Sequence, residues 1–281
     1  EHPEVKEYLL NVAKHWIEEI GIDGWRLDVA DEVDHAFWRE FRTTVKQANP
    51  DAYILGEMWN ESSEWLQGDQ FDAVNDFFVK KVTDAQSFAF AIGRQLARYP
   101  LQASEVAFNL LDSHDTPRLL TLCGGDKRLM RLAALFQFTY MGAPCIFYGD
   151  EVGLDGDADP GCRQCMEWDT DKQDHELFDF YRELIALRKA HPVLRDQGSI
   201  TFLEAQPEGS SLAYERRSDE EVLLVLFNRS EEDHTFELSI PEQEWEVAFG
   251  ESQWSVGPEG LHVELPPYGY AVLKAAPARS V

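Results

Sequence analysis

The sequence predicts an α/β region with a parallel sheet, followed by an antiparallel β-sandwich. In the first part, short apolar runs alternate with longer amphipathic segments, always in the order strand then helix. This alternation indicates a parallel sheet. From about Gln197, short alternating runs separated by turn-rich segments take over, as is typical of a sandwich. We therefore expect one domain over residues 1–196 and a second over residues 197–281.

The opening helix is expected over residues 3–20, because Pro3 suits a first helical turn and Gly21 is a natural C-terminal stop. Strands are then expected at residues 24–29, 52–57, 71–75, 106–115 and 143–148. The segments that follow these strands are expected to be helical at residues 34–48, 63–66, 83–98, 127–140 and 174–191. In the second part, residues 211–215, 222–227 and 270–273 predict strands of the sandwich.

Three of the predicted strands end in an acid, namely Asp28, Glu57 and Asp115. A strand interior has little use for a carboxylate, whereas α/β proteins keep their active sites at the carboxyl ends of parallel strands. Alternation puts Trp25, Leu27 and Val29 on one strand face, and Ile22, Gly24, Arg26 and Asp28 together on the other. A guanidinium there favours the charged form of the acid. A purely structural ion pair at the strand end remains an alternative interpretation.

These strand ends carry an Arg-x-Asp, a Gly-Glu and a His-Asp in that order, and they resemble the α-amylase family of glycoside hydrolases. Residues 24–35 (GWRLDVADEVDH) and 110–118 (LLDSHDTPR) are similar to its neopullulanase, cyclomaltodextrinase and maltogenic amylase branch. The resemblance covers essentially the whole chain. It implies the C-terminal portion of a (β/α)8 TIM barrel, strands 4 to 8, because a closed barrel needs eight strands and about 250 residues. The antiparallel β-sandwich domain follows.

The same resemblance implies the roles of the site residues. Retaining glycosidases use a nucleophilic carboxylate and a general acid/base, and these roles fall to Asp28 and Glu57. Asp115 would hold sugar hydroxyls in the distorted ring. Apolar neighbours should raise the pKa of Glu57 and keep its proton.

Three further residues are expected to bind substrate or orient the acids: Arg26 beside Asp28, His114 on a sugar hydroxyl, and Trp59 as a stacking face. Taken alone, His114 and Trp59 are as readily explained by packing. Weaker candidates are His35, Asp112 and Arg118. Asp31 and Glu32 are expected to line the cleft without chemistry, and Arg163, in a loop expected near its mouth, receives no role.

The composition excludes several classes of partner. Acids outnumber bases by 52 to 25, a net charge of −27, which argues against nucleic acid or an anionic membrane but does not repel a neutral glucan. No apolar run approaches the length of a membrane span. The Cys162–Cys165 spacing lacks the two further ligands of a zinc site, so no metal or cofactor is expected. Reduced thiols in the cytoplasm are the default expectation for these cysteines.

The leading hypothesis is a retaining hydrolase of α-1,4 bonds, with α-1,6 bonds as a further option, in cyclomaltodextrin, pullulan or starch, with some transglycosylation. The alternative is a non-catalytic amylase-like fragment that serves in assembly or carbohydrate binding. An aldolase-type barrel would need a Schiff-base lysine, and only Lys80 and Lys81 lie near the strands. The resemblance implies a homodimeric parent protein. Five open strands predict association of the fragment through its barrel edges.

Overall fold

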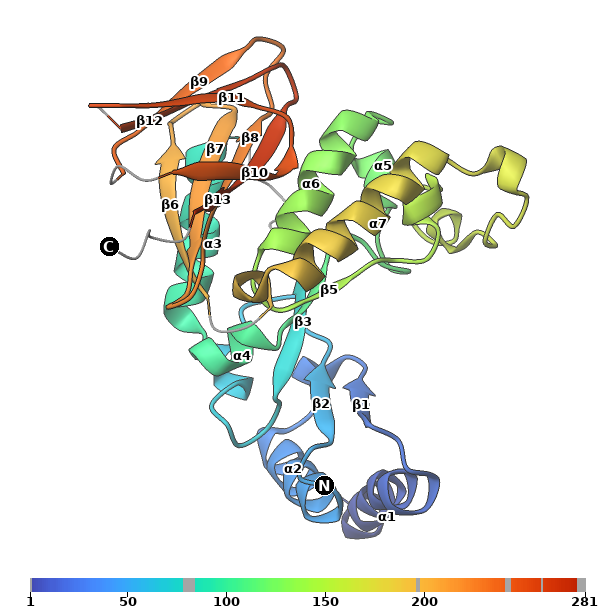
Figure 1. Ribbon diagram of the computed structural model, residues 1–281. Coiled ribbons are helices and arrows are strands. Elements are labelled where there is room, and N and C mark those ends of the chain that lie inside the picture. The colour runs from blue at the N-terminus through green and yellow to red at the C-terminus, as the bar shows by residue number, and fades with distance from the viewer. Residues whose placement is uncertain (1, 78–83, 196–197, 241–243, 259, 277–281) are drawn as a thin grey trace. The chain divides into compact units, whose positions relative to one another are not determined.

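The computed structural model describes residues 2–77, 84–195, 198–240, 244–258 and 260–276 (Figure 1). The chain divides into two compact units, Glu1–Phe77 with Arg94–Asn109 and Phe78–Gly93 with Leu110–Val281. The domain boundary expected between residues 196 and 197 lies outside the described residues, as do Lys80 and Lys81. That boundary stays a prediction.

The first unit begins with α1 (Pro3–His15), which continues into a π-helical turn, Trp16–Ile20. Gly21 ends this segment with a φ of 77°, a left-handed conformation that glycine adopts without steric cost. The remaining elements are β1 (Gly24–Leu27), α2 (His35–Ala48), β2 (Tyr53–Gly56), a 3-10 turn (Ser63–Trp65), β3 (Ala73–Phe77), α4 (Leu101–Glu105) and β4 (Phe108–Leu110), with α3 (Ala85–Arg98) divided between the units. Strands and helical segments alternate as predicted, and α4 is a helix that the sequence did not predict.

Parallel pairing joins the strands of the first unit in chain order (Figure 1). β1 and β2 pair from Gly24 opposite Tyr53 to Leu27 opposite Gly56. Gly56 lies under Phe71, where an added Cβ would come within 2.7 Å of the ring. The core of this unit gathers aromatic and aliphatic side chains from α1, α2 and the strands, among them Trp38, Phe41, Val45, Ile54 and Phe71.

Side chains alternate between the two faces of β1 over fewer residues than the sequence predicted. Trp25 and Leu27 pack against the core, as expected for one face of the strand. Ile22, which was expected on the opposite face with Arg26, packs against the same core. The prediction for Ile22 was wrong because a bend at Asp23 precedes the strand, so two-residue periodicity starts only at Gly24.

In the second unit, α5 (Leu119–Leu122) precedes α6 (Lys127–Thr139), β5 (Ala143–Cys145) and α7 (His175–Ala190), and α6 and α7 run side by side (Figure 1). Asp115 does not end a strand, because β4 stops at Leu110. A turn takes over, in which the Thr116 amide donates to the Ser113 carbonyl at 3.3 Å and the Ser113 amide to Thr116 Oγ1 at 2.8 Å. Hydroxyl side chains of this kind compete with strand pairing for backbone groups.

The C-terminal strands form two antiparallel sheets, as predicted. One sheet has the order β10-β13-β8-β7-β6 and the other the order β11-β12-β9. Their apolar sides share a core that includes Leu224, Leu226, Phe236 and Val263. The strands are β6 (Ser199–Ala205), β7 (Ser211–Arg217), β8 (Val222–Asn228), β9 (His234–Leu238), β10 (Trp245–Gly250), β11 (Gln253–Gly257), β12 (Gly260–Leu265) and β13 (Tyr270–Ala275).

Within the described residues, each helix is too short or too polar to cross a membrane.

Candidate active site

Glu57 leaves the carboxyl end of β2 and is buried, with 4% of its surface exposed. Its amide donates to the Leu27 carbonyl at 2.8 Å and so extends the pairing of β1 with β2 by one residue. Ile54, Leu55 and Met58 around it are buried apolar residues. The sheet therefore fixes the backbone of Glu57, and buried apolar residues surround this part of the chain.

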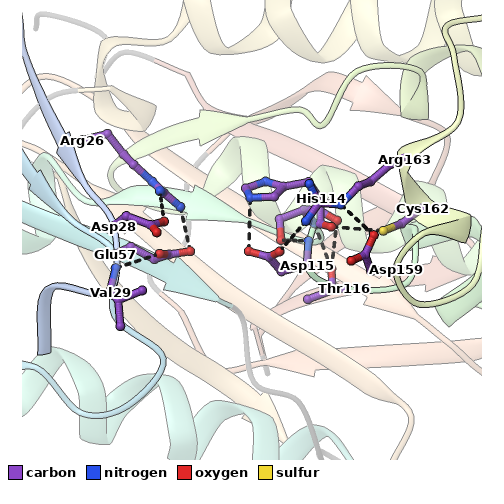
Figure 2. A network of polar contacts seen from close by, with 11 residues as sticks. Arg26, Asp28, Val29, Glu57, His114, Asp115, Thr116, Asp159, Cys162 and Arg163 are labelled. Atoms are coloured by element: carbon purple, nitrogen blue, oxygen red, sulfur yellow. Dashed lines mark hydrogen bonds and ion pairs between the residues drawn. The ribbon is translucent and has the colours of Figure 1, made fainter. Parts of the chain in front are cut away.

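Arg26 joins the first two predicted acids (Figure 2). Its Nη1 pairs with Asp28 Oδ1, and its Nη2 lies 2.7 Å from Glu57 Oε1. The Val29 amide donates to the other oxygen, Glu57 Oε2, at 3.1 Å. The side chain of Asp28 is 71% exposed. The two acids thus differ in solvent access although one guanidinium contacts both.

The pKa of Glu57 is raised above its ordinary value. Burial is the largest cause, because it disfavours the charged carboxylate. A hydrogen bond to Asp28 and the charge of Asp28 act in the same direction. The Val29 amide and the Arg26 charge oppose them without reversing the result. Glu57 therefore keeps its proton to higher pH than a free glutamate, as its sequence neighbours predicted.

Val29, which supplies that amide, has a backbone φ of 48°. A β-branched residue rarely adopts this left-handed conformation, which costs of order 1–3 kcal/mol. The conformation turns the chain sharply after Asp28 and aims the Val29 amide at Glu57. Strain at this point is thus coupled to the placement of the buried acid.

A second polar group in the other unit contains His114 and Asp115 (Figure 2). His114 Nε2 lies 3.2 Å from Asp115 Oδ2. Arg163 Nη2 donates to Asp115 Oδ1 at 3.0 Å, and Arg163 Nε lies 2.8 Å from Asp159 Oδ1. Sequence reasoning gave Arg163 no role. The signal that could have found it is its position as the only base in the acidic stretch 150–169.

The Cys162–Cys165 pair does not form one site. Cys162 is buried and its thiol donates to the His114 carbonyl at 3.1 Å, whereas Cys165 is exposed. The described part of the chain holds no group of three or more His, Cys, Asp or Glu side chains that could bind a metal ion.

The structure thus groups Arg26, Asp28 and Glu57 in the first unit, and His114 and Asp115 in the second. Trp59 follows Glu57 by two residues and is 41% exposed. Structural contacts explain His35. Its ring centroid lies 4.7 Å from that of Trp65, and its Nδ1 is 2.8 Å from Gln70 Oε1. Asp31 and Glu32 are exposed on the turn that follows β1.

Residues 1–173 match the family described as alpha amylase, catalytic domain, and residues 200–272 match the family described as maltogenic amylase, C-terminal domain. The chain belongs to the α-amylase family. Together with the parallel and antiparallel sheets, this membership confirms the predicted fold class, the C-terminal portion of a (β/α)8 barrel followed by an antiparallel β-sandwich domain. It leaves no basis for the aldolase-type alternative.

Several α-amylase family proteins resemble the chain over most of its length. A cyclomaltodextrinase from Bacillus sp is 62% identical over 244 residues, which are 84% of this chain and 44% of the relative. Neopullulanase 2 from Thermoactinomyces vulgaris is 49% identical over 252 residues, 86% of this chain and 43% of the relative. A solved cyclomaltodextrinase structure superimposes with a TM-score of 0.88 at 54% identity, covering 98% of this chain and 49% of the other. The chain spans about half the length of these relatives.

Proposed function

We propose that the chain carries the catalytic acids of a retaining α-glucan hydrolase. The single observation that supports this most strongly is the buried Glu57, whose raised pKa and contact with Arg26 and Asp28 pair a proton donor with a solvent-accessible carboxylate. Glycoside hydrolysis needs two acids in such opposed surroundings. The family of the chain is one of glycoside hydrolases, which agrees with this chemistry.

In the proposed reaction, a carboxylate oxygen of Asp28 attacks the anomeric carbon of the sugar. Glu57 gives its proton to the glycosidic oxygen as that bond breaks, and the aglycone leaves as an alcohol. Glu57, now a carboxylate, takes a proton from water, whose oxygen displaces Asp28 and releases the sugar with its original anomeric configuration. Transfer to a second sugar hydroxyl in place of water gives transglycosylation.

The contact between the two acids favours retention over inversion. Inverting enzymes hold their carboxyl groups about 6.5–9.5 Å apart to leave room for a water molecule. Glu57 and Asp28 instead contact the same guanidinium, and Asp28 acts on the ionisation of Glu57. Arg26 contacts both acids. It orients Asp28 for attack, and its positive charge would stabilise the negative charge that Glu57 gains when it loses its proton.

Asp115 and His114 are proposed to bind hydroxyls of the reacting sugar and so favour its distorted ring. In the structure Arg163 pairs with Asp115 Oδ1 and His114 with Asp115 Oδ2. Sugar hydroxyls would compete with these partners for the carboxylate oxygens. Trp59, with its exposed ring, is the proposed stacking face.

The proposed substrates are cyclomaltodextrin, pullulan and starch, cleaved at α-1,4 bonds with α-1,6 bonds as a further option. The names of the relatives, cyclomaltodextrinase and neopullulanase, support this choice. Neutral glucans also suit a chain of net charge −27, since no charge opposes their approach. The homodimer and the cytoplasmic location predicted above belong to the same proposal.

Trapping the covalent intermediate tests the assignment. α-Maltosyl fluoride needs no acid to leave, so Glu57→Gln should still form the glycosyl-enzyme but hydrolyse it slowly, because the base for water is missing. Peptide mapping by mass spectrometry should then find a maltosyl group on Asp28. The same variant should hydrolyse unactivated glucan about 100- to 10,000-fold more slowly than the wild type.

Asp31→Asn is the matched control, since Asp31 is an exposed acid three residues from Asp28. It should leave both the trapping and the turnover unchanged. A sugar attached to another acid, or a product whose first-formed anomer is β, would overturn the retaining mechanism through Asp28.

A further inference from the structure

Three charged side chains are buried together in the second unit, and the proposed mechanism uses none of them. Arg118 is 0% exposed, and Asp112 and Asp150 are almost as deeply buried. Arg118 Nη1 lies 3.3 Å from Asp150 Oδ1. Asp112 Oδ2 accepts from the Leu119 amide at 2.7 Å, and Asp112 lies near enough to Asp150 to raise the pKa of that acid. Burying so many charges is costly, so a cluster of this kind calls for an explanation.

The guanidinium of Arg118 is fixed by the segment that follows β5. Its Nη1 donates to the Tyr148 carbonyl at 2.7 Å. Its Cζ lies 4.4 Å from the ring centroid of Phe147 and 4.7 Å from that of Tyr148, both cation–π contacts. A lysine could replace the charge but not the planar stacking on the two rings.

The backbone of Arg118 is tied to a third segment. Its amide donates to the Gly156 carbonyl at 2.9 Å, and the Gly156 amide donates to Thr121 Oγ1 at 2.8 Å. Arg118 thus connects the loop after β4, the segment after β5 and the start of the loop that carries Arg163. The loop after β4 is 30 residues or more from the other two segments, so its arrangement against them depends on such contacts.

The same segments determine where the Asp115 carboxylate lies. Arg163 holds one of its oxygens, and Cys162 of the same loop donates to the His114 carbonyl. The Tyr148 hydroxyl donates to the Gln164 carbonyl, next to Arg163. Arg118 is three residues from Asp115 and contacts the backbone of both supporting segments.

The two buried acids differ from ordinary aspartates. Burial raises the pKa of Asp150, and its neighbour Asp112 raises it further, while Arg118 opposes the shift. The pKa of Asp112 is raised as well, again mainly by burial. The pair therefore keeps a proton to higher pH than two free aspartates would, which reduces the negative charge buried beside the guanidinium.

We propose that Arg118 is a positioning residue that holds the loop bearing His114 and Asp115 in the arrangement needed to bind the reacting sugar. It touches no substrate, and its effect on activity passes through Asp115. This inference rests on the function proposed above for Asp115. Its structural part, the fixing of the loop, is tested separately from activity.

Hydrogen exchange tests the structural part. In Arg118→Lys, the amides of Asp115, Thr116 and Leu119 should lose protection about tenfold or more, while the core of the sandwich keeps its protection. Arg188→Lys is the matched control, because Arg188 is also buried but donates to carbonyls of Phe138 and Tyr140 at the end of α6. It should leave the amides of Asp115, Thr116 and Leu119 protected. Unchanged exchange in folded Arg118→Lys would overturn the proposal.

A double-mutant cycle tests the functional part. Arg118→Lys should lower kcat/KM on a maltooligosaccharide about 100-fold, the effect of misplacing a binding group by roughly 1 Å. In an Asp115→Asn background the same change should cost less than about threefold, because the group that Arg118 positions is already lost. Independent, multiplicative losses would overturn the proposal.

Two controls keep these outcomes separate. If Arg118→Lys does not fold, Arg118→Met combined with Asp150→Asn removes the cation together with the carboxylate that contacts it, and the same amides should again lose protection. If the wild-type chain shows no turnover, the proposed function fails, while hydrogen exchange still decides whether Arg118 fixes the loop.

Discussion

At Glu57, burial and the neighbouring carboxylate of Asp28 act in the same direction, and together they outweigh Arg26 and the Val29 amide. The backbone places the two acids at the ends of neighbouring strands, since β1 ends one residue before Asp28 and β2 ends one residue before Glu57. The side chain of Asp28 reaches solvent, whereas that of Glu57 turns into the core. Two carboxylates of similar chemistry thus acquire different proton affinities from their places on one sheet.

The raised pKa of Glu57 makes stability depend on pH. Because the folded-state pKa lies above the unfolded-state value, this group stabilises the fold fully below the unfolded-state pKa, and the contribution is lost as pH rises through the folded-state pKa. Glu57→Gln removes the ionisation, so it should raise the free energy of unfolding at pH 8 by about 1 kcal/mol. Urea unfolding at pH 8 and pH 4 measures this gain, which should shrink at the lower pH.

Glu32→Gln serves as the matched control, because Glu32 is exposed on the turn after β1. It should leave the free energy of unfolding unchanged at both pH values. A Glu57→Gln variant that is less stable than the wild type at pH 8 would contradict the assigned cause of the pKa shift.

The contact of Arg26, Asp28 and Glu57 could be predicted from the sequence, because alternation puts the first two on one face and adjacent parallel strands bring the third beside them. The role of Arg163 could not. It meets Asp115 across 48 residues through a loop without periodicity, and no local pattern encodes such a contact. The assignment of Trp59 to sugar stacking stays a prediction.

At the scale of elements, Asp72 connects α2 to β2. Its two carboxylate oxygens accept from Arg42 Nη1 at 2.8 Å, from Lys46 Nζ at 2.8 Å and from the Ile54 amide at 2.9 Å. Burial alone would raise the pKa of Asp72, but the hydrogen bonds from Lys46, Arg42 and Ile54 outweigh it and lower the pKa. The carboxylate form therefore stabilises the packing of the helix on the strand.

Asp72→Asn should lower the free energy of unfolding at pH 7 by about 2 kcal/mol, because two cations lose a charged acceptor. With its folded-state pKa lowered, Asp72 contributes stability above its unfolded-state pKa, and that stability is lost as pH falls through the folded-state value. The deficit of the variant in urea unfolding should therefore shrink toward pH 3.

Asp69→Asn provides the comparison, since the pair of Asp69 with Arg39 is exposed and should contribute less than about 1 kcal/mol. An equal loss of unfolding free energy in the two variants would show that burial of the Asp72 group adds nothing to stability.

Helix starts were predicted well where a capping side chain marks them. Asp34 accepts from the Ala36 amide at 2.8 Å and Asp174 from the Leu177 amide at 2.9 Å, so α2 and α7 begin where the sequence indicates. The strand ending at Asp115 was predicted too long, because residues 111–113 are as compatible with a turn as with a strand and hydroxyl hydrogen bonds decide between them. The short helices α4 and α5 carry too few residues for a periodic signal.

At the scale of the molecule, Arg216 of β7 is a buried link within the second unit. Its guanidinium donates to the carbonyls of Thr139 at 2.5 Å, Val193 at 2.8 Å and Gly198 at 3.2 Å. One side chain therefore holds the end of α6, the turn after α7 and the first residues of the sandwich together. The carbonyls have no access to water that could replace it.

Arg216→Met should lower the free energy of unfolding by about 3 kcal/mol or more, because several buried carbonyls lose their donor at once. Arg217→Met is the neighbouring control, since Arg217 is half-exposed and pairs with Glu215, and its loss should cost less than about 1 kcal/mol. Denaturant unfolding of both variants measures the difference. Similar midpoints would refute the role of Arg216 as a link.

Association of the chain is the prediction that belongs to the whole molecule. Within the described residues β1 pairs on one side only, with β2, and an apolar cavity of about 560 Å³ lies beside it, lined by Leu9, Trp25 and Phe37. A strand edge next to apolar surface favours pairing with another chain. The purified chain should therefore either associate or lack turnover on cyclomaltodextrin, as light scattering and an activity assay would measure. Full turnover by a proven monomer would contradict this expectation.

The loop of Arg163 also carries two thiols of very different accessibility, Cys162 buried and Cys165 exposed. Burial raises the pKa of the remaining two, Cys123 and Cys145, to about 11, so neither forms much thiolate at neutral pH. A maleimide fluorophore should consequently attach to Cys165 in preference to the other three. The native sequence thus offers a single spectroscopic handle two residues from the arginine that contacts Asp115.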